Sequence, residues 1–389
     1  MKILYAGVYN EYLNPTERNY LIMMKNLDAV FYGPGFVSED ILKKGIDNFI
    51  QNNDGFDFII TTTFSFEDHL FEKYTTFVKD FTKYRYIFFP KKHLSYIKTI
   101  KDDILKINDT NIIYIIGFDP YNIKKDFFNI LKKKNIYTIL LGKQFISSID
   151  NLKTINKEKF SKSVNDNYFN FINNYDNKII SFYHIIGENE FKYNALDNRK
   201  YEISVMGVLY NNRKNILKQL KKSNIKLPSR IYNIFYSFLN KIGFSPYSNI
   251  ILLYLYNSIF QYNLFNSKIS FTSGSELNIP VRKFFEIPAH ASLLLAYPCN
   301  GFEDLGFKNN INYIKLNNDE DIIDITTSII NDKVKAQDIA TKGQELIFRH
   351  HSTTARSNQL KNCLEAIQAN NYNGSFWKNG EFKVRLKND

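Results

Sequence analysis

A carboxylate with two neighbouring cations stands in an otherwise apolar stretch of the second half of the chain. Glu286 lies within 284–287, whose other members are two phenylalanines and an isoleucine, and Arg282 and Lys283 directly precede this stretch. A carboxylate in apolar surroundings must be paired or hydrogen-bonded to be tolerated. Two interpretations follow: Glu286 accepts hydrogen bonds from a diol such as that of a ribose, or it forms a buried salt bridge with Arg282 or Lys283.

Two loops that follow predicted strands carry residues suited to binding a phosphate. Gly207 ends the strand predicted over 201–206, with Arg213 six residues further on, and Ser275 lies in the polar loop after the strand predicted over 268–271. In open parallel sheets, ligands bind beyond the carboxyl ends of the strands. A glycine there lets a phosphate approach the backbone, and an arginine can neutralise it. The alternative for Arg213 is a solvated cation in the first turn of a basic helix.

Alternating strands and helices must position these residues. The first half predicts strands over 2–6, 56–61, 86–89, 112–116, 136–141 and 179–183, with helices from Ser38 to about 50 and over about 123–134. The second half predicts strands over 201–206, 268–271, 292–295 and 312–315, and helices over 213–222, 281–289, 319–331, 334–348 and 352–369. Strands separated by helices of this length indicate parallel β-α-β units with right-handed crossovers.

The alternation predicts an α/β fold with two Rossmann-like, doubly wound parallel-sheet domains. We expect the first domain over 1–190 and the second over 191–370. The tail over 371–389 holds the single tryptophan, Trp377, and is expected to pack back on the body.

The composition narrows the class of protein. A hydrophobic fraction of 44% with 16% aromatics excludes a disordered chain. No apolar run approaches the roughly 18 residues of a membrane span. The first residues are too polar for a secretory signal, so a cytoplasmic protein is expected. With only Cys299 and Cys363, neither a disulfide framework nor a cysteine-rich zinc site is expected.

The net charge of +12 bears on the partners of the chain. Nucleic acid is not expected, because no binding module is visible and lysine greatly outnumbers arginine, the better reader of bases. A peripheral contact with an anionic membrane, at the inner face of that membrane, fits the basic charge better, since lipid-linked acceptors lie beside anionic headgroups.

The segment over 278–356 resembles the carboxy-terminal half of group 1 glycosyltransferases of the CgeB-like (spore maturation) type. The matching residues are Arg282, Phe285, Glu286, 289–291, 293–295, His351, Ser352, Thr353 and Arg356. Upstream, 201–207 together with Arg213 is similar to the opening of the same domain. There are two departures. Related retaining enzymes carry a glutamate eight positions before Glu286, where this chain has Asn278, and the family often has a glycine where this chain has His290 and Ala291.

The resemblance implies the GT-B architecture and a bacterial hexosyltransferase of cell-surface glycan biosynthesis. Such an enzyme moves a sugar from a nucleotide-diphosphate sugar, with UDP favoured, to a glycan, lipid-linked or protein acceptor, with retention and with neither metal nor cofactor. Glu286 would hold the ribose, and Gly207, Ser275 and Asn278 would complete the donor site. Arg213 and Arg282 would stabilise the leaving diphosphate.

The acceptor is expected on the first domain. Gly7 and Asn10 follow the first strand, and His69 could act near the acceptor hydroxyl, although a histidine of the surface or core is the alternative. His350 and His351 are neighbours on a predicted helix and point in different directions, which argues against a shared metal. Two other functions remain open: a GT-B-like epimerase or phosphorylase, and a non-catalytic, basic, membrane-associated scaffold, which Asn278 suggests.

Overall fold

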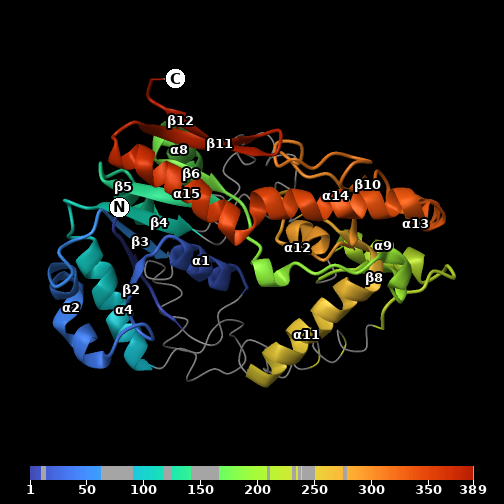
Figure 1. Ribbon diagram of the computed structural model, residues 1–389, viewed down its shortest axis with the longest axis horizontal. Coiled ribbons are helices and arrows are strands. Elements are labelled where there is room, and N and C mark those ends of the chain that lie inside the picture. The colour runs from blue at the N-terminus through green and yellow to red at the C-terminus, as the bar shows by residue number, and fades with distance from the viewer. Residues whose placement is uncertain are drawn as a thin grey trace.

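The computed structural model describes residues 1–9, 15–62, 91–116, 125–141, 166–207, 211–229, 250–274 and 278–388, together with positions 234 and 238. Within these residues the chain forms two parallel sheets and a carboxy-terminal hairpin. Figure 1 shows the two sheets side by side, with the helices α14 (Lys333–His351) and α15 (Thr353–Gln368) running along one side from the second sheet to the first.

The first sheet has six parallel strands in the order β2-β1-β3-β4-β5-β6. Their bounds are β1 Ile3–Ala6, β2 Val30–Tyr32, β3 Phe58–Thr62, β4 Asn111–Ile116, β5 Ile136–Leu141 and β6 Ile179–Phe182. The helices of this part are α1 Pro15–Asn26, α2 Glu39–Gln51, α4 Lys91–Ile104, α5 Lys125–Leu131 and α8 Asp166–Asn174, followed by the short 3-10 helix η4 Asp176–Lys178.

Both faces of the first sheet are covered, because its strands are apolar on both sides. Ile59 packs in a core with α2, α4, α5 and α8, whereas its neighbour Ile60 packs in the opposite core with α1 and α15. Successive side chains of a strand point to opposite faces, so a strand covered on both sides is a nearly continuous apolar run. This is the pattern that the sequence shows at 58–60 and 112–116.

The second sheet has four parallel strands in the order β10-β9-β8-β7. Their bounds are β7 Tyr201–Val205, β8 Ser267–Thr272, β9 Leu293–Ala296 and β10 Ile314–Lys315. The helices are α9 Asn211–Leu220, α11 Ile250–Asn266, α12 Lys283–Ala289, α13 Ile322–Asn331 and α14, with the 3-10 helices η5 Glu188–Glu190, η6 Leu196–Asn198 and η8 Asp319–Asp321. Helices again cover both faces. The predicted α/β fold with two Rossmann-like parallel-sheet domains is therefore confirmed.

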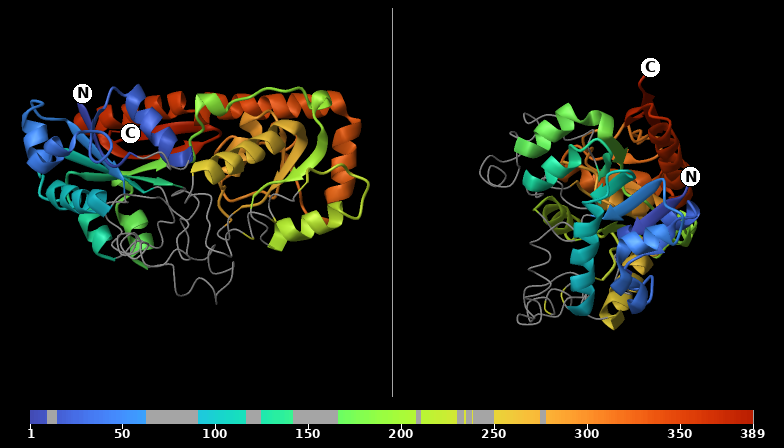
Figure 2. Two further views of the ribbon diagram at one scale, coloured as in Figure 1. Left: turned by 90° about the horizontal axis from the view of Figure 1, so that it is seen from below. Right: turned by 90° about the vertical axis from the view of Figure 1, so that its left-hand side faces the viewer.

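The carboxy-terminal segment returns to the first sheet. Leu360 and Leu364 of α15 lie in the core beneath α1, and the antiparallel hairpin of β11 (Tyr372–Lys378) and β12 (Glu381–Leu386) lies beside β6. Both views of Figure 2 place this segment with the amino-terminal half of the chain. The range 191–370 expected for the second domain thus includes a helix that packs on the first sheet.

Trp377 fastens the hairpin at the junction of the two sheets. Its Nε1 donates to the carbonyl oxygen of Ser181 over 2.8 Å, and its ring stacks on His351 with centroids 4.9 Å apart. The Arg356 guanidinium lies 4.5 Å from the Trp377 ring centroid and donates to His351 Nδ1 over 2.8 Å. Close by, the chain passes between the two sheets twice, near Ile186 and near Ser352. These two segments form a parallel β-bridge, in which the Ile186 N–H donates to the carbonyl oxygen of His351 over 3.0 Å.

Several elements differ from the sequence prediction. α1, β2, α4 and the terminal hairpin were not predicted; β2 is only three residues long, and each hairpin strand carries polar or charged residues among its apolar ones. The helix predicted from Ser38 is present but is kinked at Gly45, whose φ is 83°. The predicted strand over 86–89 lies outside the described residues. Among the described helices, none is both long and apolar enough to span a membrane.

Replacing Trp377 by alanine should destabilise the protein by about 3–5 kcal/mol, because it opens a cavity in a closed core and removes the ring beneath Arg356. Phe376 is the matched control, since it lies on the other face of β11 and is partly exposed. Urea denaturation of Trp377→Ala and Phe376→Ala would measure both losses. Equal losses would contradict the role given to Trp377.

Candidate functional site

A lysine side chain crosses a glycine at the carboxyl edge of the second sheet. Gly207 follows β7 with a φ of 88°, a conformation that residues with side chains rarely adopt. A Cβ atom on Gly207 would lie 2.2 Å from Cε of Lys283 and 3.0 Å from its Nζ. Gly207 is thus favoured both by its backbone angle and by the space that Lys283 takes. The arrangement places the Lys283 ammonium at the edge where parallel sheets bind ligands.

Arg213 joins α9 to the loop after β8. It lies in the first turn of α9, its side chain is buried, and its Nη2 donates to the carbonyl oxygen of Ser273 over 2.7 Å. The alternative of a solvated cation is therefore wrong. Burial lowers the pKa of Lys283 most strongly; Glu286 raises it, Arg213 and Arg282 lower it further, and the net shift is downward. This edge of the sheet therefore favours an anion.

Arg282 holds Glu286 in a network of ion pairs. Its Nε donates to Oε1 of Glu286 over 2.7 Å, its Nη1 donates to the carbonyl oxygen of Ile185 over 2.6 Å, and its Nη2 forms an ion pair with Glu190. The structure thus contains the buried salt bridge that was one interpretation of Glu286, and every nitrogen of Arg282 has a partner.

Glu190 extends the network to the first sheet. Its Oε1 accepts hydrogen bonds from Asn19 Nδ2 and from the Gly187 backbone N–H, each over 2.8 Å. Asn19 belongs to α1 and also donates to the carbonyl oxygen of Ile185 over 2.8 Å. Burial alone would raise the pKa of Glu190, but the charge and hydrogen bonds of Arg282, with those of Asn19 and Gly187, hold it below the ordinary value. The network therefore ties the helix that carries Glu286 to α1.

Glu286 itself keeps one oxygen for another partner. Only Oε1 of its carboxylate is engaged by Arg282, and within the described ranges no hydrogen bond to Oε2 is found. The side chain is 9% exposed, so it neither faces bulk water nor is sealed completely. A carboxylate oxygen in this setting can accept a hydrogen bond from a ligand hydroxyl.

Arg199 fixes the end of the helix that carries Glu286, and sequence reasoning missed it. It is buried, and its Nη2 donates to the carbonyl oxygens of His290 and Ala291 over 2.7 and 2.8 Å. Ala291 has a φ of 48°, the left-handed conformation that the glycine of the resembling family would adopt without strain. The sequence carries no signal for Arg199, because its partners are backbone carbonyls and not side chains.

The loops after β8 and β9 pack against each other near Asn278. Asn278 has a φ of 54° and donates from Nδ2 to Oδ1 of Asn300 over 3.3 Å. A Cβ atom on Gly274 would lie 2.7 Å from Sγ of Cys299, so the approach is too close for a side chain there. Burial raises the pKa of the Cys299 thiol to about 12, which suits a packing residue. Ser275, predicted to bind the donor, lies outside the described residues.

The residues predicted on the acceptor side are only partly described. Gly7 follows β1 as expected, but it is buried, and its N–H donates to the carbonyl oxygen of Tyr32 over 3.0 Å. A Cβ atom on Gly7 would lie 2.9 Å from Cε1 of the Tyr5 ring, too close for a side chain. Packing therefore explains this glycine without a ligand. Asn10 and His69 lie outside the described residues.

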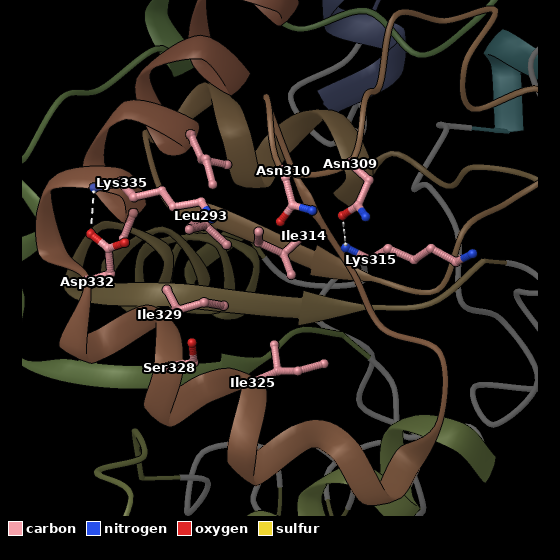
Figure 3. A pocket seen from close by; sticks show the side chains of 12 residues that line it. Leu293, Asn309, Asn310, Ile314, Lys315, Ile325, Ser328, Ile329, Asp332 and Lys335 are labelled. Atoms are coloured by element: carbon pink, nitrogen blue, oxygen red, sulfur yellow. Dashed lines mark hydrogen bonds between the residues drawn. The ribbon is translucent and has the colours of Figure 1, made fainter.

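A separate hollow of about 250 Å³ lies between β10, α13 and α14 (Figure 3). Leu293 and Ile314, which line it, are the first residues of β9 and β10, so the hollow is not at the edge where Gly207 lies. Two of its polar side chains cap backbone groups: Asn309 Oδ1 accepts from the Lys315 N–H over 2.9 Å, and Asp332 Oδ1 accepts from the Lys335 N–H over 3.2 Å. We assign no chemistry to it.

Replacing Arg282 by methionine should destabilise the protein by about 3–5 kcal/mol, because it leaves two buried carboxylates unpaired. The triple variant Arg282→Met, Glu190→Gln and Glu286→Gln should recover much of this loss, since no unpaired charge remains. Chemical denaturation measures both, with the exposed Arg349→Met as control. A triple variant as unstable as the single one would contradict the electrostatic account.

Glu190 should make the stability acid-sensitive. Its pKa is lower in the folded protein than its ordinary value of 4.5, so its contribution is complete above that pH and is lost as the pH falls through the folded-state pKa. We therefore expect Glu190→Gln to be less stable than the wild type at neutral pH, with the difference shrinking in acid. Denaturation across this range, with the exposed Glu345→Gln as control, checks it. A difference that does not change with pH would count against this role.

Known proteins share this architecture. By sequence the chain matches no family model and no curated protein. Among solved structures it resembles HepE of Anabaena in complex with UDP, at 11% identity and a TM-score of 0.52, covering 94% of this chain and 100% of that chain. The complex of HepE with UDP and glucose is 11% identical, with a TM-score of 0.50, over 94% of this chain and 100% of that chain. A glycosyltransferase of Rickettsia africae is 14% identical, with a TM-score of 0.48, over 95% of this chain and 99% of that chain. The chain thus has the GT-B fold of two Rossmann-like domains.

Proposed function

We propose that the chain is a glycosyltransferase that uses a nucleotide-diphosphate sugar, with UDP-sugars favoured. The observation that carries the proposal is the group of Gly207, Arg213, Lys283 and Glu286 at the carboxyl edge of the second sheet. Cations there suit a diphosphate, and a carboxylate oxygen suits a ribose hydroxyl. HepE, whose fold the chain shares, was solved with UDP, and with UDP and glucose.

Each residue of the site has a place in this proposal. The ribose hydroxyls donate to Oε2 of Glu286, while Arg282 orients that carboxylate through Oε1. The diphosphate approaches the backbone at Gly207, beside Arg213. Ser275 and Asn278 complete the donor site, as the resemblance to the CgeB-like family implies. Arg282 thereby acts on the reaction through Glu286 and not as the partner of the leaving group.

The reaction needs charge stabilisation at the diphosphate. The bond between the sugar C1 and the diphosphate oxygen breaks with its electron pair going to that oxygen, the acceptor hydroxyl oxygen bonds to C1, and its proton is released. Cations fixed beside the leaving oxygens stabilise the charge that develops there. We propose that side chains supply this without a metal, and that the anomeric configuration is retained, as in the enzymes that the chain resembles.

The acceptor is proposed to be a glycan, a lipid-linked glycan or a protein, bound on the side of Gly7, Asn10 and His69. A cytoplasmic enzyme of bacterial cell-surface glycan synthesis, peripheral at the inner face of an anionic membrane, fits this acceptor and the basic net charge of +12. The second candidate is an epimerase or phosphorylase at the same site, since the same cations would bind its nucleotide or phosphate. The third is a non-catalytic, membrane-associated scaffold, which would bind no donor.

Incubation with a panel of nucleotide sugars tests the function. Transfer to added acceptor, or donor hydrolysis, is the expected result; a released, epimerised sugar would indicate the epimerase. A thermal-shift screen with UDP, GDP, CMP and dTDP precedes it, since a ligand at 100 times its Kd stabilises the folded state by about 2.7 kcal/mol. Absence of any nucleotide binding would refute the transferase.

Arg213→Ala should lower kcat/KM for the active donor by about 10²–10³, the loss seen when a preorganised group of this kind is removed. Lys218→Ala is the matched control, because Lys218 is an exposed cation on the same helix and should leave the rate unchanged. Steady-state release of the nucleoside diphosphate measures both. Equal rates for Arg213→Ala and Lys218→Ala would remove Arg213 from the site.

A further inference from the structure

We infer that Lys283, and not its neighbour Arg282, is the cation that contacts the diphosphate of the donor. The inference rests on the proposed function and assigns one residue of that site. From the sequence, the role was assigned to Arg282, which matches an arginine of the CgeB-like pattern. The structure separates the two residues by the direction in which their side chains run.

The two side chains have opposite surroundings. Arg282 is directed into the ion-pair network, where Glu286, Glu190 and the carbonyl of Ile185 engage its three nitrogens. Lys283 runs the other way and lies over Gly207, at the end of β7. In the part of the chain that the structure describes, its ammonium makes no hydrogen bond and no ion pair.

A partly buried ammonium that has no partner among the described residues favours an external anion. Lys283 carries three N–H donors in a partly buried position, with Arg213 near enough to act on its charge. Glu286 is the carboxylate that acts on it most, but Arg282 already engages one oxygen of that group. A diphosphate at Gly207 would therefore supply the negative charge that this edge lacks.

Gly207 makes the contact feasible. A side chain at 207 would occupy the space of the Lys283 Cε atom and push the ammonium away from the strand end. Without that side chain, the Lys283 ammonium lies against the backbone of Gly207 at the end of β7. This position suits a phosphate, because it places a cation at the carboxyl end of a parallel strand, where such sheets bind ligands.

The test compares ligands with and without phosphates on the full-length chain. Calorimetry with the nucleoside diphosphate selected by thermal shift should show an affinity at least about tenfold lower for Lys283→Met than for the wild type. The affinity for the matching nucleoside should stay within about twofold, because methionine keeps the aliphatic part of the side chain. Lys283→Arg should recover most of the affinity, and Lys218→Met, on the exposed face of α9, should change neither ligand.

Inorganic pyrophosphate gives a second readout that does not depend on the nucleoside. It should raise the Tm of the wild type and compete with the nucleoside diphosphate, and it should do neither with Lys283→Met. Lys283→Gln repeats the measurement in case Lys283→Met does not fold.

The outcomes distinguish the role inferred for Lys283 from the proposed glycosyltransferase function. A nucleoside diphosphate bound equally by the wild type and Lys283→Met would overturn the inference while the transferase proposal stands. A wild-type protein that binds pyrophosphate through Lys283, but none of the four nucleotides, would keep the anion site and overturn the transferase proposal. A wild-type protein that binds neither would overturn both.

Discussion

The pairing of Arg282 with Glu190 and Glu286 is the constraint on which the candidate site depends. Three ionised groups share a place that is only slightly exposed, with side-chain exposures of 12%, 14% and 9%. Such charges are tolerated only when each meets an opposite charge and further hydrogen bonds, which Asn19, the Gly187 N–H and the carbonyl of Ile185 supply. The orientation of α12, and with it the places of Glu286 and Lys283, follows from satisfying this group.

Much of the fold could be predicted from the sequence, because parallel strands covered on both faces are continuous apolar runs. β5 was predicted with its bounds, and β4, β6, β8 and β9 within a residue. Short elements such as β2 leave no such pattern. The return of α15 to the first sheet could not be predicted, since its apolar stripe fits either sheet and the choice is made by long-range packing on α1.

The types of residue in the candidate site could be predicted from the sequence, but the directions in which their side chains point could not. A carboxylate in an apolar run singled out Glu286, and its position after a strand singled out Gly207. Which of Arg282 and Lys283 meets Glu286 depends on the rotation of a helix that begins at the second of them. That rotation is set by the ion-pair network of Arg282, by the burial of Phe284 and Phe285, and by Arg199 at the other end. The spacing of the residues in the sequence does not reveal it.

The return of α15 and the terminal hairpin also constrains how the chain can fold during its synthesis. One face of the first sheet is covered by α1 and by residues 353–386, which are synthesised after both parallel sheets, whereas β1 is synthesised before the second sheet. Domains commonly fold as they emerge, from the amino terminus onward. Here part of one apolar face of the first sheet stays uncovered until residues 353–386 have been made, which is after the strands of the second sheet. A truncation before residue 353 would therefore expose apolar surface on the first sheet, although that sheet is made of the residues synthesised earliest in this sequence.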